Sequence, residues 1–487
     1  MEIRRSMLVI IALCLILTAG AALRLYQLPE LLHFADDEGR DMMIAEKISS
    51  GEDWPALGPS SSTRNFYLGP IFYYAMGATL KAWDHPAAPA VMVALISVAT
   101  GYLLYRLGKE MFSVSAGLIM AALWSFSYMA IIQARWAWHP NVLPFFVTVL
   151  IWCLFHLHRP KNNGWHGDNW YILGLFASTT VAVQLHATAF LLVPAIVIYW
   201  IFFPPKIRNP WAWSAGLGLA LFLCAPVLAY ELKNNWANIG GAISQLKQGE
   251  PYPVDNRFLY VAKSLMASVT ELFGTIKYFG LISILAVGPV LGVFIWNLIK
   301  KTIPNFWPIK WFILIWLIIA GGFYLLFSGQ LFPHYFIFLF PAIYLLIGLF
   351  WETLKKLLWL RYLLIASLVA ISYAGIATSV GFLNSLQNGT AKGSYGVPLK
   401  DEQAAVAAVK DTGVNRVELN TRALDSYDRA YQYLLEKSGI EIDTQATTKI
   451  VLYRLSETTD LADLEKSFES FEHRSFGTVG LLIGTRK

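Results

Sequence analysis

Charged side chains are scarce in this sequence. Only 14% of the 487 residues are charged and 56% are hydrophobic, whereas an ordinary soluble domain carries about 25% charged residues. A single soluble core cannot hold so many apolar side chains, so the composition excludes an ordinary soluble protein and predicts an integral membrane protein.

Cysteine is rare, and several common catalytic motifs are missing. The three cysteines, Cys14, Cys153 and Cys224, lie within apolar runs, so we expect buried thiols and no disulfide outside the membrane. No Walker-type loop, GxSxG motif or GxGxxG motif in a βαβ context occurs, which disfavours a soluble nucleotide-sugar or ATP-binding fold. The net charge of +6 comes from Lys and Arg in short loops, a pattern that sets membrane topology and does not indicate nucleic-acid binding.

Long apolar runs dominate the rest of the chain. The first, residues 7–23, follows Arg4 and Arg5; its basic, apolar and small segments also match a signal peptide, but its length predicts an uncleaved spanning helix. Ten further spans are predicted near residues 87–105, 114–134, 141–157, 170–185, 187–203, 211–230, 275–299, 310–328, 335–351 and 361–382.

The apolar segment 67–83 is short and contains Gly69, Pro70 and Gly77, and the positive-inside rule decides whether it crosses. If it does not cross, every basic cluster falls on one side: Arg4/Arg5, Arg106/Lys109, Arg159/Lys161, Lys206/Arg208, Lys300/Lys301/Lys310 and Lys355/Lys356/Arg361. We therefore predict a re-entrant or surface-lying helix there, eleven spans in total, a cytoplasmic N-terminus and an external C-terminus. The expected location is the cell (inner) membrane.

The composition becomes charged and polar near residue 390. Helical periodicity appears at 401–410 and 424–437, and short β-rich runs appear at 416–419, 449–453 and 479–483. The predicted fold class is thus an α-helical polytopic membrane domain followed by a small extracytoplasmic α/β domain. The membrane domain covers residues 1–385, with a first outer loop at 28–86, and the external domain covers residues 390–487.

The outer side collects unusual polar residues. Asp36, Asp37 and Glu38 stand together after the first span, and such carboxylate clusters serve as a base, a cation site or a substrate clamp, or else form a solvated acidic loop. Arg135 and Trp138 lie between two spans, where they could form an aromatic anchor belt or a phosphate-binding site with aromatic walls.

His139, His186 and His334 also fall at outer helix ends, where a histidine often does no more than form a hydrogen bond. No HxxxH or HxH spacing occurs among the outer histidines, which disfavours a zinc site.

Four stretches carry a resemblance to a known family. They are DEGR at 37–40 with IAEKI at 44–48, LGPIFYY at 68–74, RWAWHPN at 135–141, and the pair at 334–335 before Pro341. In this order they resemble membrane glycosyltransferases of the GT-C class, in particular aminoarabinose transferases and family-39, protein-O-mannosyltransferase-like enzymes. The resemblance covers residues 1–385 and does not extend to the external domain.

The resemblance implies an inverting glycosyltransferase that moves a sugar from a polyprenyl-phosphate donor to a hydroxyl of a protein, lipid or glycan on the extracytoplasmic face. It places the general base at Asp37, with Glu38 assisting or orienting it. Arg40 matches an arginine of the family, and Arg135 is a second candidate for stabilising the phosphate. The expected substrate-binding residues are Arg40, Arg64, Tyr73, Arg135, Trp138, His139, Asn141, His186, His334 and Tyr335.

The chain departs from the family at two places. Gly69 stands where relatives carry a lysine, so Arg64 is a candidate replacement, and His139 or Asn141 lies where aminoarabinose transferases carry an aspartate. No cofactor is expected to be required, although Asp36, Asp37 and Glu38 could hold a divalent cation, as in oligosaccharyltransferases of the same superfamily.

Two other function classes stay open from the sequence. A transporter or flippase for lipid or sugar would need charges and broken helices at the bilayer midplane, and the predicted spans carry few such charges. A non-catalytic scaffold with a partner-binding external domain is the third reading. Neither the sugar nor the acceptor follows from the sequence.

Overall fold

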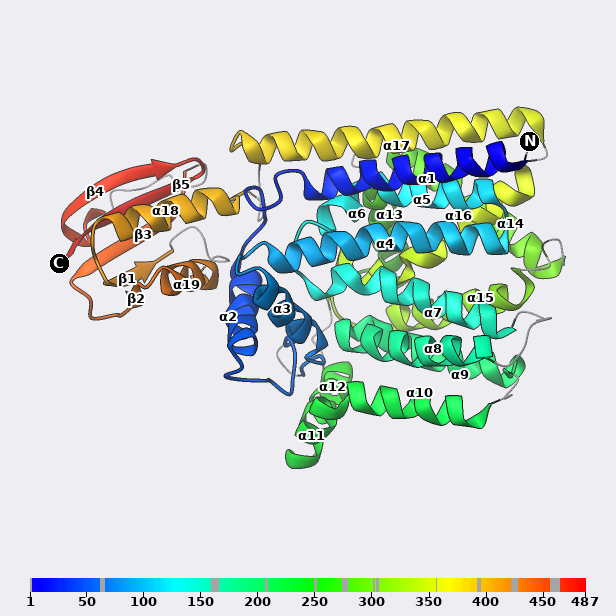
Figure 1. The fold of residues 1–487 in the computed structure, drawn as a ribbon, viewed down its shortest axis with the longest axis horizontal. Coiled ribbons are helices and arrows are strands. Elements are labelled where there is room, and N and C mark those ends of the chain that lie inside the picture. Colours follow the sequence, from blue (N-terminus) through cyan, green and yellow to red (C-terminus); the bar gives the residue numbers. More distant parts are fainter. Residues whose placement is uncertain are drawn as a thin grey trace.

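The computed structural model describes residues 2–61, 66–158, 166–205, 209–248, 252–273, 279–300, 303, 306–355, 357–391, 396–421, 428–455 and 465–487. Of the residues predicted above, Arg64, Arg159, Lys161, Lys206, Arg208, Lys301 and Lys356 lie outside the described residues. The chain forms a large bundle of helices with a small α/β domain at one end (Figure 1).

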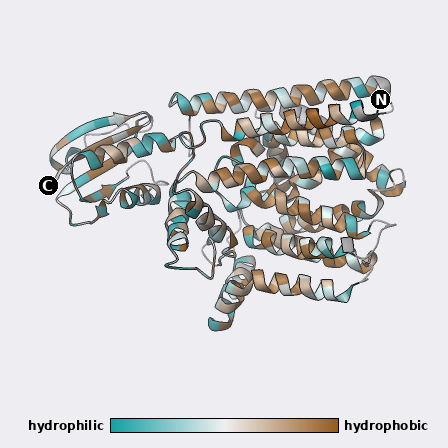
Figure 2. Ribbon diagram, in the orientation of Figure 1, coloured by the Kyte–Doolittle hydropathy of each residue, from teal (hydrophilic) through white to brown (hydrophobic). Residues whose placement is uncertain are grey.

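Long apolar helices run side by side along the bundle, and Figure 2 shows their hydrophobic colouring. Within the described residues, six helices are long and apolar enough to cross a membrane: Arg4–Leu25, Ala88–Met111, His139–His158, Pro308–Leu326, Pro333–Leu354 and Trp359–Gln387. A seventh candidate is the pair Pro210–Leu223 and Ala225–Lys233, which is bent by 61°. The total of eleven spans stays a prediction.

The helices of the bundle have the following bounds. The first half contains α1 (Glu2–Leu25), α4 (Ala88–Met111), α5 (Val114–Ser125), α6 (Tyr128–Gln133), η1 (His139–Val142), α7 (Leu143–His158), α8 (His166–Leu185), η2 (Ala187–Leu191) and α9 (Leu192–Phe202). The second half contains α10 (Pro210–Leu223), α11 (Ala225–Lys233), α12 (Ala237–Gln248), α13 (Arg257–Phe273), α14 (Phe279–Ile299), α15 (Trp307–Leu326), η4 (Pro333–Leu339), α16 (Phe340–Leu354) and α17 (Leu358–Gln387).

Several predicted spans are each divided into two helical pieces, among them 114–134 and 187–203. The segment 114–134 divides into α5 and α6, because the Ser127 side chain accepts a hydrogen bond from Ala130 N and starts a new helix. The segment 187–203 begins as the 3₁₀ helix η2 and continues as α9. Both breaks lie near predicted site residues.

Two short helices, α2 (Asp36–Ser50) and α3 (Ile71–Ala82), lie across one end of the bundle (Figure 1). Helix α3 has 12 residues, so it measures about 18 Å and is too short to cross a hydrocarbon core of about 30 Å. Its length agrees with the prediction that segment 67–83 does not cross. Helix α2 ends at Gly51, whose φ of 83° is the left-handed conformation that glycine adopts readily.

The small domain is a five-stranded sheet with strand order β2-β1-β3-β5-β4 and two helices. Its elements are α18 (Leu399–Asp411), β1 (Arg416–Asn420), α19 (Asp428–Lys437), β2 (Glu441–Ile442), β3 (Thr448–Arg454), β4 (Phe468–Phe476) and β5 (Val479–Arg486). Strand β1 is parallel to β2 and β3, and β5 is antiparallel to β3 and β4. The sequence predicted helix 401–410 and the three β-rich runs at the positions of α18, β1, β3 and β5.

Candidate active site

The three consecutive carboxylates form the first turn of α2, where negative charge complements the positive end of the helix dipole. Each points to a different partner. Asp36 Oδ1 accepts a hydrogen bond from Arg429 N at 3.0 Å, Asp37 Oδ1 accepts one from Arg40 at 2.7 Å, and Glu38 Oε2 accepts one from Ala35 N at 3.0 Å. The trio is therefore not a single cluster.

This divergence bears on the divalent cation that the sequence left open. Within the described parts of the chain, no three His, Cys, Asp or Glu side chains are arranged to hold a metal ion. A cation site on Asp36, Asp37 and Glu38 stays a prediction, and the observed contacts give it no ligand set.

Asp37 belongs to a chain of polar contacts that runs from the surface into the interior. Its side chain is 55% exposed and pairs with Arg40, whose guanidinium also binds the buried Asp41 at 2.6 Å. The Tyr73 hydroxyl of α3 donates to the same Asp41 oxygen at 2.9 Å. Burial raises the pKa of Asp41 to about 6, although the Arg40 charge opposes that shift. Arg40 is thus held between two carboxylates, one exposed to solvent and one enclosed.

Glu38 has the opposite environment from its neighbour Asp37. It is 5% exposed, and burial raises its pKa to about 8, with the Asp37 and Asp41 charges adding to the effect. His33 Nε2 lies 3.9 Å from Glu38 Oε2, and burial lowers the pKa of His33 to about 4 despite the nearby Asp37. Both side chains are therefore mainly uncharged at neutral pH.

The rings of five predicted site residues form one contiguous cluster together with His33 and Trp136. His33 lies 5.0 Å from Trp136, which lies 5.3 Å from Trp138, and Trp138 lies 4.9 Å from His334, each measured between ring centroids. The cluster then continues through Tyr335, His186 and His139. Segments far apart in sequence thus meet beside the Glu38 end of α2.

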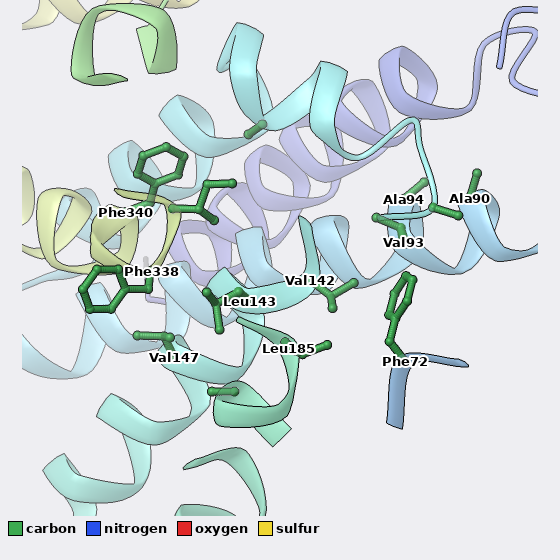
Figure 3. Packing of buried hydrophobic residues seen from close by; sticks show 14 of the residues in the cluster. Phe72, Ala90, Val93, Ala94, Val142, Leu143, Val147, Leu185, Phe338 and Phe340 are labelled. Carbon is green, nitrogen blue, oxygen red and sulfur yellow. The ribbon is translucent and has the colours of Figure 1, made fainter. Parts of the chain in front are cut away.

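The hydrophobic core under this cluster fixes the elements that carry it. Figure 3 shows Phe72 extending from α3 toward Val93 and Ala94 of α4, with Val142 and Leu185 near the middle of the same view. The Phe72 ring also contacts His139 edge-on, at 6.3 Å between centroids. Packing of buried apolar side chains therefore holds α3, η1 and the end of α8 in place.

Two of the histidines have their proton positions set by backbone partners. His139 Nδ1 donates to the Leu185 carbonyl, since a carbonyl can only accept, which leaves Nε2 as an acceptor. His186 Nδ1 accepts from Thr188 N at 3.2 Å, which leaves its Nε2 carrying hydrogen. The two rings thus offer one acceptor and one donor, which suits the hydroxyl groups of a sugar.

Arg135 is a buried cation with no carboxylate partner among the described residues. It is 4% exposed, its Nη1 donates to the carbonyls of Leu23 and Arg24 at 3.3 and 2.9 Å, and its Nη2 has no partner within the described residues. Burial lowers its pKa to about 10. A guanidinium in this setting can receive an anion, because its free donors are already desolvated.

Gly69 and Asn141 have structural roles that the sequence did not reveal. A Cβ at Gly69 would overlap the side chain of Gln184, so Gln184 fills the space beside this position. Gln184 Nε2 donates to Leu223 O at 3.0 Å, while its Oε1 is buried without a partner within the described residues. Asn141 donates to Trp136 O at 3.3 Å and therefore braces the turn that carries the two indoles.

Sequence reasoning did not include Asp41, Gln184 and His33 among the site residues. The signal for Asp41 was its position four residues after Asp37, which places both side chains on one side of a helix. Gln184 and His33 were not chosen, because only the folded chain places Gln184 against Gly69 and encloses His33 with Glu38. The other predicted residues in the described ranges lie at this end of the bundle.

Comparisons with known proteins agree with this architecture. Residues 69–230 match the sequence model of the family described as dolichyl-phosphate-mannose-protein mannosyltransferase. No curated protein sequence matches the chain significantly.

Among solved structures, ArnT from Cupriavidus metallidurans bound to undecaprenyl phosphate is similar, with 11% identity, a TM-score of 0.60, and coverage of 98% of this chain and 97% of that one. The oligosaccharyltransferase AglB from Archaeoglobus fulgidus, in complex with an inhibitory peptide and a dolichol-phosphate, has 13% identity and a TM-score of 0.52, with coverage of 98% and 74%. These structural similarities show that the chain shares the overall fold of the two proteins.

Proposed function

We propose that this chain, a multi-pass membrane protein with the GT-C fold, transfers a sugar from a polyprenyl-phosphate donor to an acceptor hydroxyl. The observation that carries the proposal is the half-exposed Asp37 carboxylate paired with Arg40, at the end of the bundle where the aromatic cluster lies. The match to a mannosyltransferase family and the polyprenyl phosphates named for two similar structures support it. The acceptor is a hydroxyl of a protein, lipid or glycan.

In the proposed reaction Asp37 acts as general base. It removes the proton of the acceptor hydroxyl as the oxygen attacks the anomeric carbon, and the bond from that carbon to the phosphate oxygen breaks with inversion. The electron pair leaves with the polyprenyl phosphate, which needs no general acid because phosphate is a good leaving group. Arg40 and Arg135 offset the charge that grows on the phosphate.

The other site residues have binding roles in this proposal. Trp138, Tyr335 and the histidine rings form walls against which a sugar ring packs, and the donor and acceptor nitrogens of His186 and His139 bind its hydroxyls. The polyprenyl tail lies among membrane lipids. No cofactor enters any step, and the identity of the sugar is left to experiment.

A Glu38→Gln variant tests which carboxylate is the base. Glu38 is mostly protonated near neutral pH, so the substitution preserves its uncharged state, and the amide oxygen can still accept from Ala35 N. We expect kcat near pH 6.5 to stay within about threefold of the wild-type value, because no base has been removed. A loss as deep as that of an Asp37 variant would instead make Glu38 the base.

The Glu38→Gln variant is also expected to change how the free energy of unfolding depends on pH. The folded pKa of Glu38 lies above its ordinary value of 4.5, so the stability that it contributes is present at low pH and is lost as the pH rises to about 8. Glu38→Gln should flatten this part of the profile. Thermal unfolding of the detergent-solubilised protein between these pH values measures it.

The proposed orientation has its own test. A reporter fused after Lys487 should read as extracytoplasmic, because the positive-inside rule places the basic loops in the cytoplasm. Paired alkaline phosphatase and fluorescent-protein fusions measure this, since each is active on one side only. A cytoplasmic reading would refute both the span count and the outer location of the site.

Mass spectrometry of glycolipids and glycoproteins, in cells with and without the gene, tests the proposed function as a whole. We expect one glycan to be missing from an acceptor when the gene is deleted, with its polyprenyl-phosphate donor accumulating. Unchanged glycans with altered sidedness of a lipid would favour a flippase and contradict the proposal.

A further inference from the structure

Helix α2 presents two different faces. Asp37, Arg40 and Asp41 make the contacts of the proposed catalytic site, and the link to Tyr73 places this face toward α3. Asp36 and Glu46 instead bind residues of the external domain. Because an α-helix has 3.6 residues per turn, these two sets of side chains lie on different sides of the helix axis.

The second face lies against α19 of the external domain (Figure 1). A Cβ at Gly39 would overlap the backbone of Arg429 and Ala430, so the helices touch where α2 has no side chain. Backbone atoms, unlike the end of a flexible side chain, can move away only if the whole helix moves. Gly39 therefore makes close docking of α19 sterically feasible.

Polar contacts hold both ends of this crossing. At the start of α2, Asp36 accepts a hydrogen bond from Arg429 N at 3.0 Å in the first turn of α19. Toward the end of α2, Glu46 accepts hydrogen bonds from the Tyr433 hydroxyl at 2.9 Å and from Lys437 Nζ. The docking thus fixes the axial position of α2 as well as its distance from the external domain.

The chain entering the external domain is joined to the same region. Leu399 N donates to Leu32 O and Lys400 N donates to Glu30 O, both at 3.0 Å, just before α2 begins. Glu402 is fully buried, and its burial, together with the nearby Glu38 carboxyl, raises the pKa of Glu402 well above its ordinary value. The start of the external domain is therefore packed against the segment that leads into α2.

We infer that the external domain is a positioning element of the transferase site, with α19 holding α2 so that Asp37 and Arg40 keep their catalytic geometry. Gly39, Tyr433 and Lys437 are positioning residues in this account. The inference rests on the proposed function, because Asp37 is its reacting group. It assigns the external domain a part in turnover, beyond any binding of a partner.

Two sets of variants undock α19 from opposite sides of the contact. Gly39→Ala places a methyl group against the α19 backbone, whereas the double variant Tyr433→Phe, Lys437→Met removes both donors to Glu46 without altering α2, together with the contact of Lys437 with Asp84. Gly381→Ala in α17 is the matched control, because a Cβ there meets nothing within 4 Å. Hydrogen exchange over residues 36–50 measures docking, and kcat and KM for the donor measure catalysis.

We expect both undocking sets to speed exchange in α2 and to lower kcat on the order of tenfold or more, since small misplacements of a reacting group carry large rate costs. The KM for the donor should change little, and Gly381→Ala should match the wild type. Faster exchange with unchanged kcat would overturn the inference, as would a kcat loss confined to Gly39→Ala.

These results remain separable from the proposed function. If the wild-type protein transfers no sugar from any polyprenyl-phosphate donor, the proposed function fails, whereas hydrogen exchange still reports whether α19 holds α2. If the wild type is active and the variants keep their kcat, only the positioning role is lost.

Discussion

Asp37→Asn is expected to abolish sugar transfer while the protein still inserts and folds. The carboxylate is the one acidic group of the α2 first turn that is both exposed and paired with a site arginine. Asparagine keeps the shape but cannot take the proton of the acceptor hydroxyl. Loss of a general base costs about 10²- to 10⁴-fold in rate, which is measured as kcat with a radiolabelled lipid-linked donor.

Asp53→Asn is the matched control for this variant. Asp53 is an exposed carboxylate of the same outer loop, so the identical chemical change is made outside the polar chain of Asp37, Arg40 and Asp41. It should retain wild-type kcat. Full activity of Asp37→Asn in a folded protein would remove Asp37 from the role of base.

Arg135→Gln is expected to weaken donor binding strongly. Its buried guanidinium has an unpartnered Nη2 and no carboxylate partner in the described structure, so an arriving phosphate would supply the missing counter-charge. Charged hydrogen bonds contribute about 1.5–3 kcal/mol, so the KM for the donor should rise on the order of 10- to 100-fold. The thermal shift caused by added polyprenyl phosphate should shrink in parallel.

The control for Arg135 separates binding from folding, because its Nη1 also braces the end of α1. Arg135→Lys keeps the positive charge and should restore part of the ligand-induced shift. If Arg135→Gln lowers the unfolding temperature of the ligand-free protein but leaves the polyprenyl-phosphate shift intact, the residue is structural only.

The sequence predicted much of the site because its residues occur at helix ends, and helix ends follow from hydropathy. Trp138, His186 and His334 were each expected at the outer end of a predicted span, and their rings lie in one cluster. The hydropathy pattern places the end of each predicted span at one surface of the membrane. Side chains at the outer ends of neighbouring spans therefore lie at the same depth, where they can contact one another.

The different environments of Asp37 and Glu38 could not be predicted in the same way. Treated as an acidic loop, the two residues are equivalent, but as the first turn of α2 they point about 100° apart. Only the tertiary packing decides that Glu38 is enclosed with His33 while Asp37 stays open. The sequence would have indicated this difference only if a helix had been predicted to begin at residue 36, because a helix directs the two side chains to different sides.

The docking of α19 on α2 had no sequence signal at all. The contact joins Gly39 to a helix almost four hundred residues later in the chain. In the sequence, the glycine before Arg40 is recognisable only as part of the family motif and does not predict this contact. The divided predicted spans show the same limit. Apolar composition alone does not reveal that Ser127 caps a new helix within segment 114–134.

Sugar transfer by the purified protein in proteoliposomes tests the central claim most directly. The wild type and Asp37→Asn would be supplied with radiolabelled polyprenyl-phosphate sugars and with acceptor extract from cells lacking the gene. We predict that label leaves the lipid for an acceptor, and free polyprenyl phosphate appears, only with the wild type. Equal transfer by both proteins, or none by either with every donor, would contradict the account.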